Sequence, residues 1–125
     1  MVYTLLPPRG LVLWRLLLVA SLALVTYASL ARVSGDALFV GVDKLSHCLT
    51  YASLYVLAYL AFPRLLLNWS IHFALLSFGV LIEILQAQTN YRSMEAADVL
   101  ANITGTGLGN LMLSFWLKLK PGRFD

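Results

Sequence analysis

The sequence has few charged residues and a single cysteine. Charged residues make up 12% of the 125 positions, whereas 60% are hydrophobic and the mean hydropathy is +0.80. Roughly a quarter of the residues in an average soluble domain are charged, so the composition excludes an ordinary soluble domain. It predicts one polytopic membrane domain over residues 1–125. Because Cys48 is the only cysteine, no disulfide can form within the chain.

Several functional patterns are also missing. Basic residues are scattered without interleaved aromatics, so nucleic acid is not expected as a partner. The chain has no glycine-rich phosphate loop and no nucleophile beside a recognisable base. His47, Glu83 and Asp98 are of residue types that bind metals, but their spacing matches no established metal motif. The sequence therefore predicts no metal and no cofactor.

Long apolar runs are what the sequence does contain, and they predict an all-α protein. Each run is about the length that crosses ~30 Å of hydrocarbon at 1.5 Å per residue. Pro63 should end the second run, Asn68 should cap the third, and Ser93 should cap the fourth with Glu95 in its first turn. We expect a bundle of four transmembrane helices at about residues 11–30, 43–62, 69–86 and 94–117.

The first apolar run has a competing interpretation. Arg9 and Arg15 could form the basic start of a secretory signal peptide, and Ser29-Leu30-Ala31 fits a small-x-small cleavage site. The run is longer than the ~7–15 apolar residues usual in signal peptides. A transmembrane helix is therefore the favoured interpretation.

Basic residues near the helix ends predict the orientation. One side collects six of them, namely Arg9, Arg15, Arg64, Lys118, Lys120 and Arg123, and the other collects three, namely Arg32, Lys44 and Arg92. Loops rich in Lys and Arg stay in the cytoplasm. We therefore expect a multi-pass protein of the cytoplasmic membrane with both termini in the cytoplasm.

Polar side chains concentrate at one level of this predicted bundle. Asp43, His47 and Tyr51 share one helical face, because they are spaced i, i+4 and i+8. Antiparallel packing brings the start of the second helix to the same level as the end of the third and the start of the fourth. We predict that a pocket there binds substrate through Asp43, Lys44, Gln86, Arg92, Ser93, Asp98 and Asn102.

Two readings of these polar residues compete. They could tie helix ends together through interhelical hydrogen bonds, which contribute only about 0.6 kcal/mol on average in membranes. Buried carboxylates are costly unless they are paired, and the set holds more carboxylates than cations, so a functional site is favoured. Should the protein be an enzyme, Glu83 and His47 are the expected acid/base pair.

Small residues predict where helices approach each other. Gly105 and Gly109 are spaced four apart on the face that also carries Asp98 and Asn102. Glycines at this spacing allow close contact between helices in lipid. Gly79 lies on the Glu83 stripe and is expected to serve the same purpose.

At these residues the sequence resembles the VanZ-like family of small bacterial membrane proteins. Cys48 departs from the pattern, since the family more often has an aromatic after the histidine. The likeness covers about residues 40–113. Its ordered elements are Asp43-Lys44-x-x-His47 with Tyr51, Gly79-x-x-x-Glu83-x-x-Gln86, Arg92-Ser93, and Asp98-x-x-x-Asn102-x-x-Gly105 with Gly109.

The resemblance implies a role in the cell envelope, because the family's namesake is associated with low-level resistance to the glycopeptide teicoplanin. We expect the pocket to face outward and to bind a membrane lipid or a lipid-linked cell-wall precursor, with Lys44 and Arg92 contacting its anionic head group. Two alternatives stay open. One is a membrane-embedded enzyme acting on a lipid, and the other is a structural partner that docks a second copy or another membrane protein through the Gly105/Gly109 face.

Overall fold

The computed structural model describes residues 8–31, 41–63 and 68–119. Over these residues the chain forms four α-helices and no strand, which confirms the all-α prediction. The helices are α1 (Pro8–Leu30), α2 (Val42–Ala61), α3 (Asn68–Ala87) and α4 (Ala96–Lys118).

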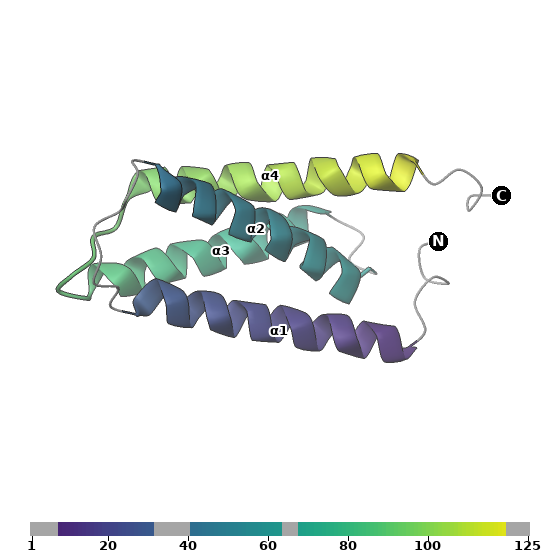
Figure 1. Cartoon of the computed structure of the whole chain (residues 1–125), viewed down its shortest axis with the longest axis horizontal. Coiled ribbons are helices and arrows are strands. Elements are labelled where there is room, and N and C mark those ends of the chain that lie inside the picture. Colours follow the sequence, from purple (N-terminus) through teal and green to yellow (C-terminus); the bar gives the residue numbers. More distant parts are fainter. Residues whose placement is uncertain (1–7, 32–40, 64–67, 120–125) are drawn as a thin grey trace.

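The four helices form an elongated antiparallel bundle (Figure 1). α2 packs against each of the other three helices, while α1 and α4 lie on opposite sides of it and do not contact each other. The most extensive contact joins α2 to α4. The last turns of α1 and α3 therefore lie at the same end of the bundle as the first turns of α2 and α4 (Figure 1). We call this the polar end.

Local chemistry explains two of the helix boundaries. Phe62 caps α2 by donating its N–H to the Ala58 carbonyl, and Pro63 then stops the helix as predicted, because a proline nitrogen has no hydrogen to donate. Gly41 precedes α2 with φ of +90°, a left-handed conformation that glycine adopts without strain.

The predicted start of the fourth helix is wrong. Ser93 lies outside α4, and Glu95 is the residue before its first turn, with an extended backbone at φ −118° and ψ 123°. The Glu95 N–H donates to a Glu83 carboxylate oxygen at 3.2 Å, and its side chain pairs with Lys44. These long-range contacts hold Glu95 outside the helix, so Asp98 is the acidic residue of the first turn.

The glycine stripe of α4 lies against α2. A methyl group added at Gly105 would collide with the Cys48 carbonyl, and one at Gly109 would lie 2.6 Å from the Ala52 carbonyl. Gly79 on α3 is equally confined, since its added methyl would lie 2.8 Å from the Tyr51 hydroxyl. The Gly105/Gly109 face is therefore covered by α2 of the same chain, and it is not open for docking another protein.

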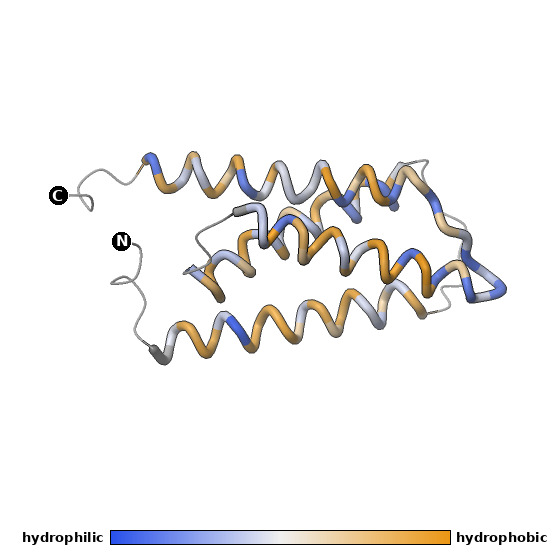
Figure 2. The backbone as a smooth tube through the Cα atoms, turned by 180° about the vertical axis from the view of Figure 1, so that it is seen from behind, coloured by the Kyte–Doolittle hydropathy of each residue, from blue (hydrophilic) through white to orange (hydrophobic). Residues whose placement is uncertain are grey.

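Two of the described helical segments, Gly10–Leu30 and Trp69–Ala87, are long and apolar enough to cross a membrane. Hydrophobic residues dominate both, whereas the connection between α3 and α4 is hydrophilic (Figure 2). That α2 and α4 also cross the membrane stays a prediction. Four of the basic residues used to predict the orientation, Arg32, Arg64, Lys120 and Arg123, lie outside the described residues, as do the side chains of Arg9 and of the predicted cap Asn68.

Candidate functional site

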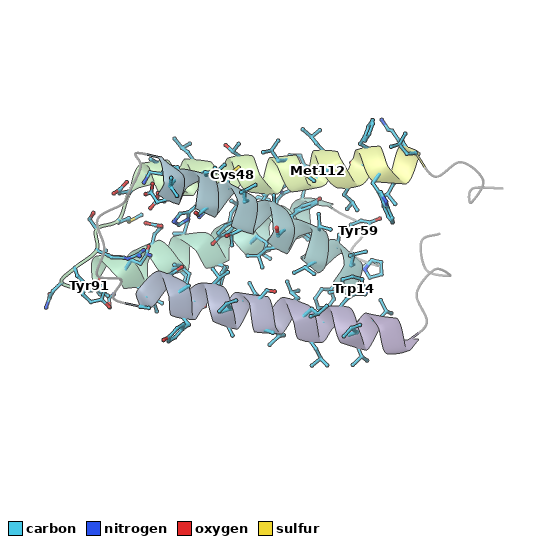
Figure 3. All side chains as sticks on the ribbon, viewed as in Figure 1. Trp14, Cys48, Tyr59, Tyr91 and Met112 are labelled. Carbon is cyan, nitrogen blue, oxygen red and sulfur yellow. The ribbon has the colours of Figure 1, made fainter. Side chains whose placement is uncertain are left out.

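A cavity of about 280 Å³ opens at the polar end of the bundle. α1, α2 and α3 contribute most of its lining, α4 contributes Asn102, and the connection between α3 and α4 contributes Arg92. Figure 3 marks this end by Tyr91, while Trp14 and Tyr59 mark the opposite end. The cavity is lined by Val25, Ala28, Ser29, Asp43, Ser46, His47, Thr50, Tyr51, Gly79, Ile82, Glu83, Arg92 and Asn102. The α1 side is therefore mostly apolar, through Val25 and Ala28, whereas most of the polar residues come from α2, α3, α4 and the connection that carries Arg92.

Lys44 lies beside this cavity at the centre of a group of carboxylates. Its ammonium is 2.7 Å from Asp43, 2.5 Å from Glu95 and 2.6 Å from Asp98. Asp98 is buried, so the ammonium compensates a carboxylate that would otherwise be costly to desolvate. With three carboxylates around it, Lys44 has little charge to offer to an external anion.

His47 links α2 to α4 next to Lys44. Its Nδ1 lies 3.1 Å from the side-chain oxygen of Asn102, which is 2% exposed. Its Nε2 lies 3.8 Å from the second oxygen of Asp98. The imidazole is therefore held between a buried amide and a buried carboxylate, and one of its faces borders the cavity.

Glu83 is the most deeply buried ionisable side chain of the site, at 1% exposure. One carboxylate oxygen accepts the Glu95 backbone N–H at 3.2 Å. The other has no hydrogen-bond partner among the described residues. An ionisable group that is buried and half-satisfied is expensive, which marks Glu83 as the chemically exceptional member of the site.

Arg92 is a cation of the site that pairs with no other residue in the described part of the chain. Its side chain lines the cavity and is exposed. It forms no hydrogen bond and no ion pair with the part of the chain that the structure describes. Guanidinium groups bind phosphates through paired N–H donors, so Arg92 is the described residue best suited to an anionic ligand.

Gln86 and Ser93 are the two predicted site residues that belong neither to the cavity lining nor to the group around Lys44. The Gln86 side chain is buried and donates to the Ser29 carbonyl of α1 at 2.9 Å, so it ties α3 to α1. Ser93 is exposed on the connection between α3 and α4. The structure brings the other polar candidates together, with Asp43, His47, Glu83, Arg92 and Asn102 at the cavity and Lys44 and Asp98 beside it.

Among the described residues, two groups of side chains are close enough to hold a metal ion. His47, Glu83 and Asp98 each offer one ligand atom, and these atoms lie within 4.8 Å of one another. Asp43, Glu95 and Asp98 form the second group. The Lys44 ammonium already lies among the carboxylates of this second group.

Neither His72 nor Cys48 belongs to these groups. His72 lies near the opposite end, with its ring 4.6 Å from Tyr55 and 5.9 Å from Trp69. Cys48 is half-buried where α2 passes α4 (Figure 3). Both residues lie in helix–helix contacts.

Sequence reasoning missed two parts of the site. Glu95 was expected only to favour the helix dipole, but it pairs with Lys44 and orients Glu83. The apolar wall from α1, formed by Val25 and Ala28, was not expected either. A hydrophobic run carries no signal for which of its residues line a cavity.

The fold and the site define a class of protein, a four-helix bundle with a buried carboxylate–histidine cluster and a cavity at one end. No protein-family model, curated protein or solved structure matches this chain.

Proposed function

We propose that this chain is a multi-pass membrane protein of the bacterial inner membrane, related to the VanZ-like family. Its four helices cross the membrane, and its cavity binds the anionic head group of a lipid-linked component of the cell envelope. The observation that carries this proposal is Arg92, a cation without a partner in the described chain that lines a cavity with one apolar wall.

The shape of the cavity supports an amphiphilic ligand. Val25, Ala28 and Ile82 offer apolar surface for an acyl or prenyl chain, and Arg92 offers a charged group for phosphate. Lys44 was also expected to contact the head group, but its three carboxylate partners favour Arg92 for this role.

The surface of the bundle supports membrane insertion of all four helices. α1 buries Leu18 but exposes large apolar side chains such as Leu16 and Leu24, and α4 likewise exposes Leu111 and Phe115. Such side chains are stable in lipid and costly in water. Tryptophans favour membrane interfaces, and the sequence carries one near the start of α1, one near the start of α3 and one near the end of α4, all at the end opposite the cavity. They are Trp14, Trp69 and Trp116.

The same arrangement supports an outward-facing cavity. Lys118 ends α4 at the tryptophan end, and Arg15 lies there with its guanidinium 5.2 Å from the Phe62 ring. The positive-inside rule assigns this end to the cytoplasm. The cavity would then open to the outer leaflet, where lipid-linked wall precursors carry their head groups, and the protein could alter teicoplanin susceptibility.

Binding of polyprenyl phosphate to the detergent-purified protein tests the proposal. Native mass spectrometry would compare polyprenyl phosphate with the uncharged polyprenol, both in the presence of EDTA. We expect selective binding of the phosphate, strongly weakened in Arg92→Ala and largely kept in Arg92→Lys. Lys118→Ala removes an exposed cation at the other end and is the matched control. Equal binding of both lipids, or full binding by Arg92→Ala, would contradict the proposal.

A membrane-embedded enzyme is the second candidate. It is favoured by the proximity of His47 and Glu83, whose ligand atoms lie within 4.8 Å of each other, since an acid and a base must reach the same substrate. Incubation with lipid-linked precursors separates this candidate from simple binding. Turnover that disappears in Glu83→Gln while binding persists would establish an enzyme.

A further inference from the structure

Three side chains from three different helices meet at the polar end. His47 comes from α2, Glu83 from α3 and Asp98 from α4, with one ligand atom of each within 4.8 Å of the others. An imidazole with two carboxylates is a ligand set that suits divalent transition metals, whereas magnesium and calcium prefer oxygen ligands alone. Such an ion requires that each side chain keep one ligand atom available for it.

The contact of His47 with Asn102 prepares the imidazole as a ligand. The amide oxygen of Asn102, 3.1 Å from Nδ1, can only accept a hydrogen bond, so Nδ1 carries the hydrogen. In the neutral ring this leaves the lone pair on Nε2, on the side of Asp98. A buried partner that holds the far nitrogen of a ligating histidine is a common feature of metal sites.

The two carboxylates are prepared in the same way. One oxygen of Asp98 is engaged by Lys44 at 2.6 Å, and the other lies 3.8 Å from His47 Nε2. One oxygen of Glu83 accepts the Glu95 N–H, and the other is without a hydrogen-bond partner among the described residues although the side chain is 1% exposed. Each of the three side chains is thus held by one atom and presents another.

The His47, Glu83 and Asp98 cluster differs from the neighbouring carboxylate group in how its negative charge is compensated. Asp43, Glu95 and Asp98 surround the Lys44 ammonium, which acts as their cation. No described ammonium or guanidinium group pairs with Glu83, and Arg92, which lines the same cavity, forms no ion pair with it. The Glu83 oxygen is therefore the buried group that still requires a cation.

We propose that His47, Glu83 and Asp98 form a binding site for a divalent transition metal ion of the zinc class. Ligands about 2.1 Å from zinc in tetrahedral geometry lie about 3.4 Å apart. The 3.8 Å between Nε2 of His47 and the Asp98 oxygen is close to that separation. Three protein ligands leave a fourth position, and His47 and Glu83 line the cavity from which an external ligand would reach it.

Such an ion would also supply positive charge next to Arg92. Four carboxylates, those of Asp43, Glu83, Glu95 and Asp98, otherwise outnumber the two cations Lys44 and Arg92. A divalent ion would favour an anionic head group in the cavity. This consequence rests on the proposed function, whereas metal binding itself does not.

Zinc titration of the full-length protein tests the site. The protein would be purified in mild detergent through a tag without histidines, stripped with EDTA, and titrated with zinc chloride by calorimetry, with bound zinc measured after gel filtration. We expect one zinc per chain and no binding in Glu83→Gln or His47→Gln. Asn102→Leu, which removes the group that holds His47, should weaken binding about 10- to 100-fold.

Glu95→Gln is the control that distinguishes the two clusters. It alters the Lys44 group but keeps the backbone N–H that holds Glu83, so zinc binding should be unchanged. If Glu95→Gln lost zinc binding and Glu83→Gln kept it, the ion would be bound by the group of Asp43, Glu95 and Asp98. That result would overturn the inference. Circular dichroism and gel filtration would verify that each variant is folded.

Cobalt provides a second measurement that does not depend on affinity alone. The visible absorption of bound Co²⁺ should show tetrahedral coordination in the wild type and change in His47→Gln. Absence of both zinc and cobalt binding in the folded wild type would overturn the metal site. Binding of the phosphate lipid is measured in EDTA and therefore does not depend on the metal. The two experiments thus distinguish failure of the metal site from failure of the proposed function.

Discussion

Each end of the bundle contains a cavity, and the two cavities differ in chemistry. The one at the polar end, about 280 Å³, is lined by ionisable residues from three elements, among them His47, Glu83 and Arg92. The one nearer the opposite end, about 210 Å³, is lined by side chains such as Leu18, Leu75 and Phe78, with Ser70 as its polar residue. The same helices thus enclose a polar space and an apolar one.

The difference in lining means that the two cavities differ in their free-energy cost to the fold. A gap between apolar side chains costs lost van der Waals contacts. A cavity that borders a buried, half-satisfied carboxylate costs more, because Glu83 loses hydration without regaining a full set of partners. Stability alone would not select the polar cavity, so it is the region in which to look for function.

The largest effect should come from the most extensive helix contact of the bundle, the one between α2 and α4. Gly105→Ala places a methyl group against the Cys48 backbone carbonyl, so the helices must separate. We expect the free energy of unfolding to fall by roughly 2–3 kcal/mol. Detergent-micelle denaturation with SDS, followed by circular dichroism, would measure it.

Gly107→Ala is the matched control on the same helix. A methyl group added at Gly107 meets nothing within 4 Å, so only helix propensity changes. Alanine favours a helix interior over glycine by about 1 kcal/mol. The two substitutions should therefore have opposite signs, and equal destabilisation would mean that α2 and α4 are not packed as closely as described.

A smaller effect should separate the two cavities directly. Leu75→Ala removes a buried side chain from the apolar cavity and should cost about 2 kcal/mol, since the space is enlarged without new contacts. Glu83→Met removes the half-satisfied carboxylate, and we expect a change of no more than about 1 kcal/mol. Both are measured by the same SDS denaturation in the presence of EDTA.

The losses of unfolding free energy in Leu75→Ala and Glu83→Met together indicate whether the polar cavity is structural or functional. A loss in Glu83→Met as large as that in Leu75→Ala would mean that the carboxylate stabilises the bundle through the Glu95 N–H and nearby groups. The polar cavity would then be a structural feature. A small change, together with loss of zinc or lipid binding, would support a functional one.

The helices could be predicted from sequence because their signals are local. Apolar runs of sufficient length and the stop at Pro63 identify α1 to α4 to within a few residues. Ser93 failed as a cap because the position of Glu95 is decided by Glu83 and Lys44, which are distant in the sequence. A capping pattern cannot register contacts of this kind.

The sequence could predict at which end of the bundle the site lies, but not which side chains line it. Spacing placed the polar residues together, but the direction of each side chain depends on how far its helix is rotated about its axis. Gln86 was expected in the pocket and instead reaches Ser29 of α1. Lys44 was expected to face a ligand and instead meets Glu95, which lies 51 residues further along the chain. Neither pairing has a signature in hydropathy or spacing.

The last difference that we predict between the two ends is the side of the membrane that each faces, and testing it should leave the fold unchanged. Asn90 is exposed at the polar end, and Lys118 is exposed at the other. In a Cys48→Ser background, we expect a membrane-impermeant maleimide to label Asn90→Cys on cells with a permeable outer barrier. Lys118→Cys should react only after lysis, because the positive-inside rule assigns it to the cytoplasm.

The pair of cysteines makes the result decisive in either direction. Labelling of Asn90→Cys alone places the cavity at the outer leaflet, where lipid-linked wall precursors are the ligands to test. Labelling of Lys118→Cys alone would indicate the opposite orientation in the membrane. Lipids of the cytoplasmic leaflet would then be the candidate ligands of Arg92. External labelling of both cysteines would contradict an odd number of membrane crossings between residues 90 and 118, and α4 would then not cross the membrane.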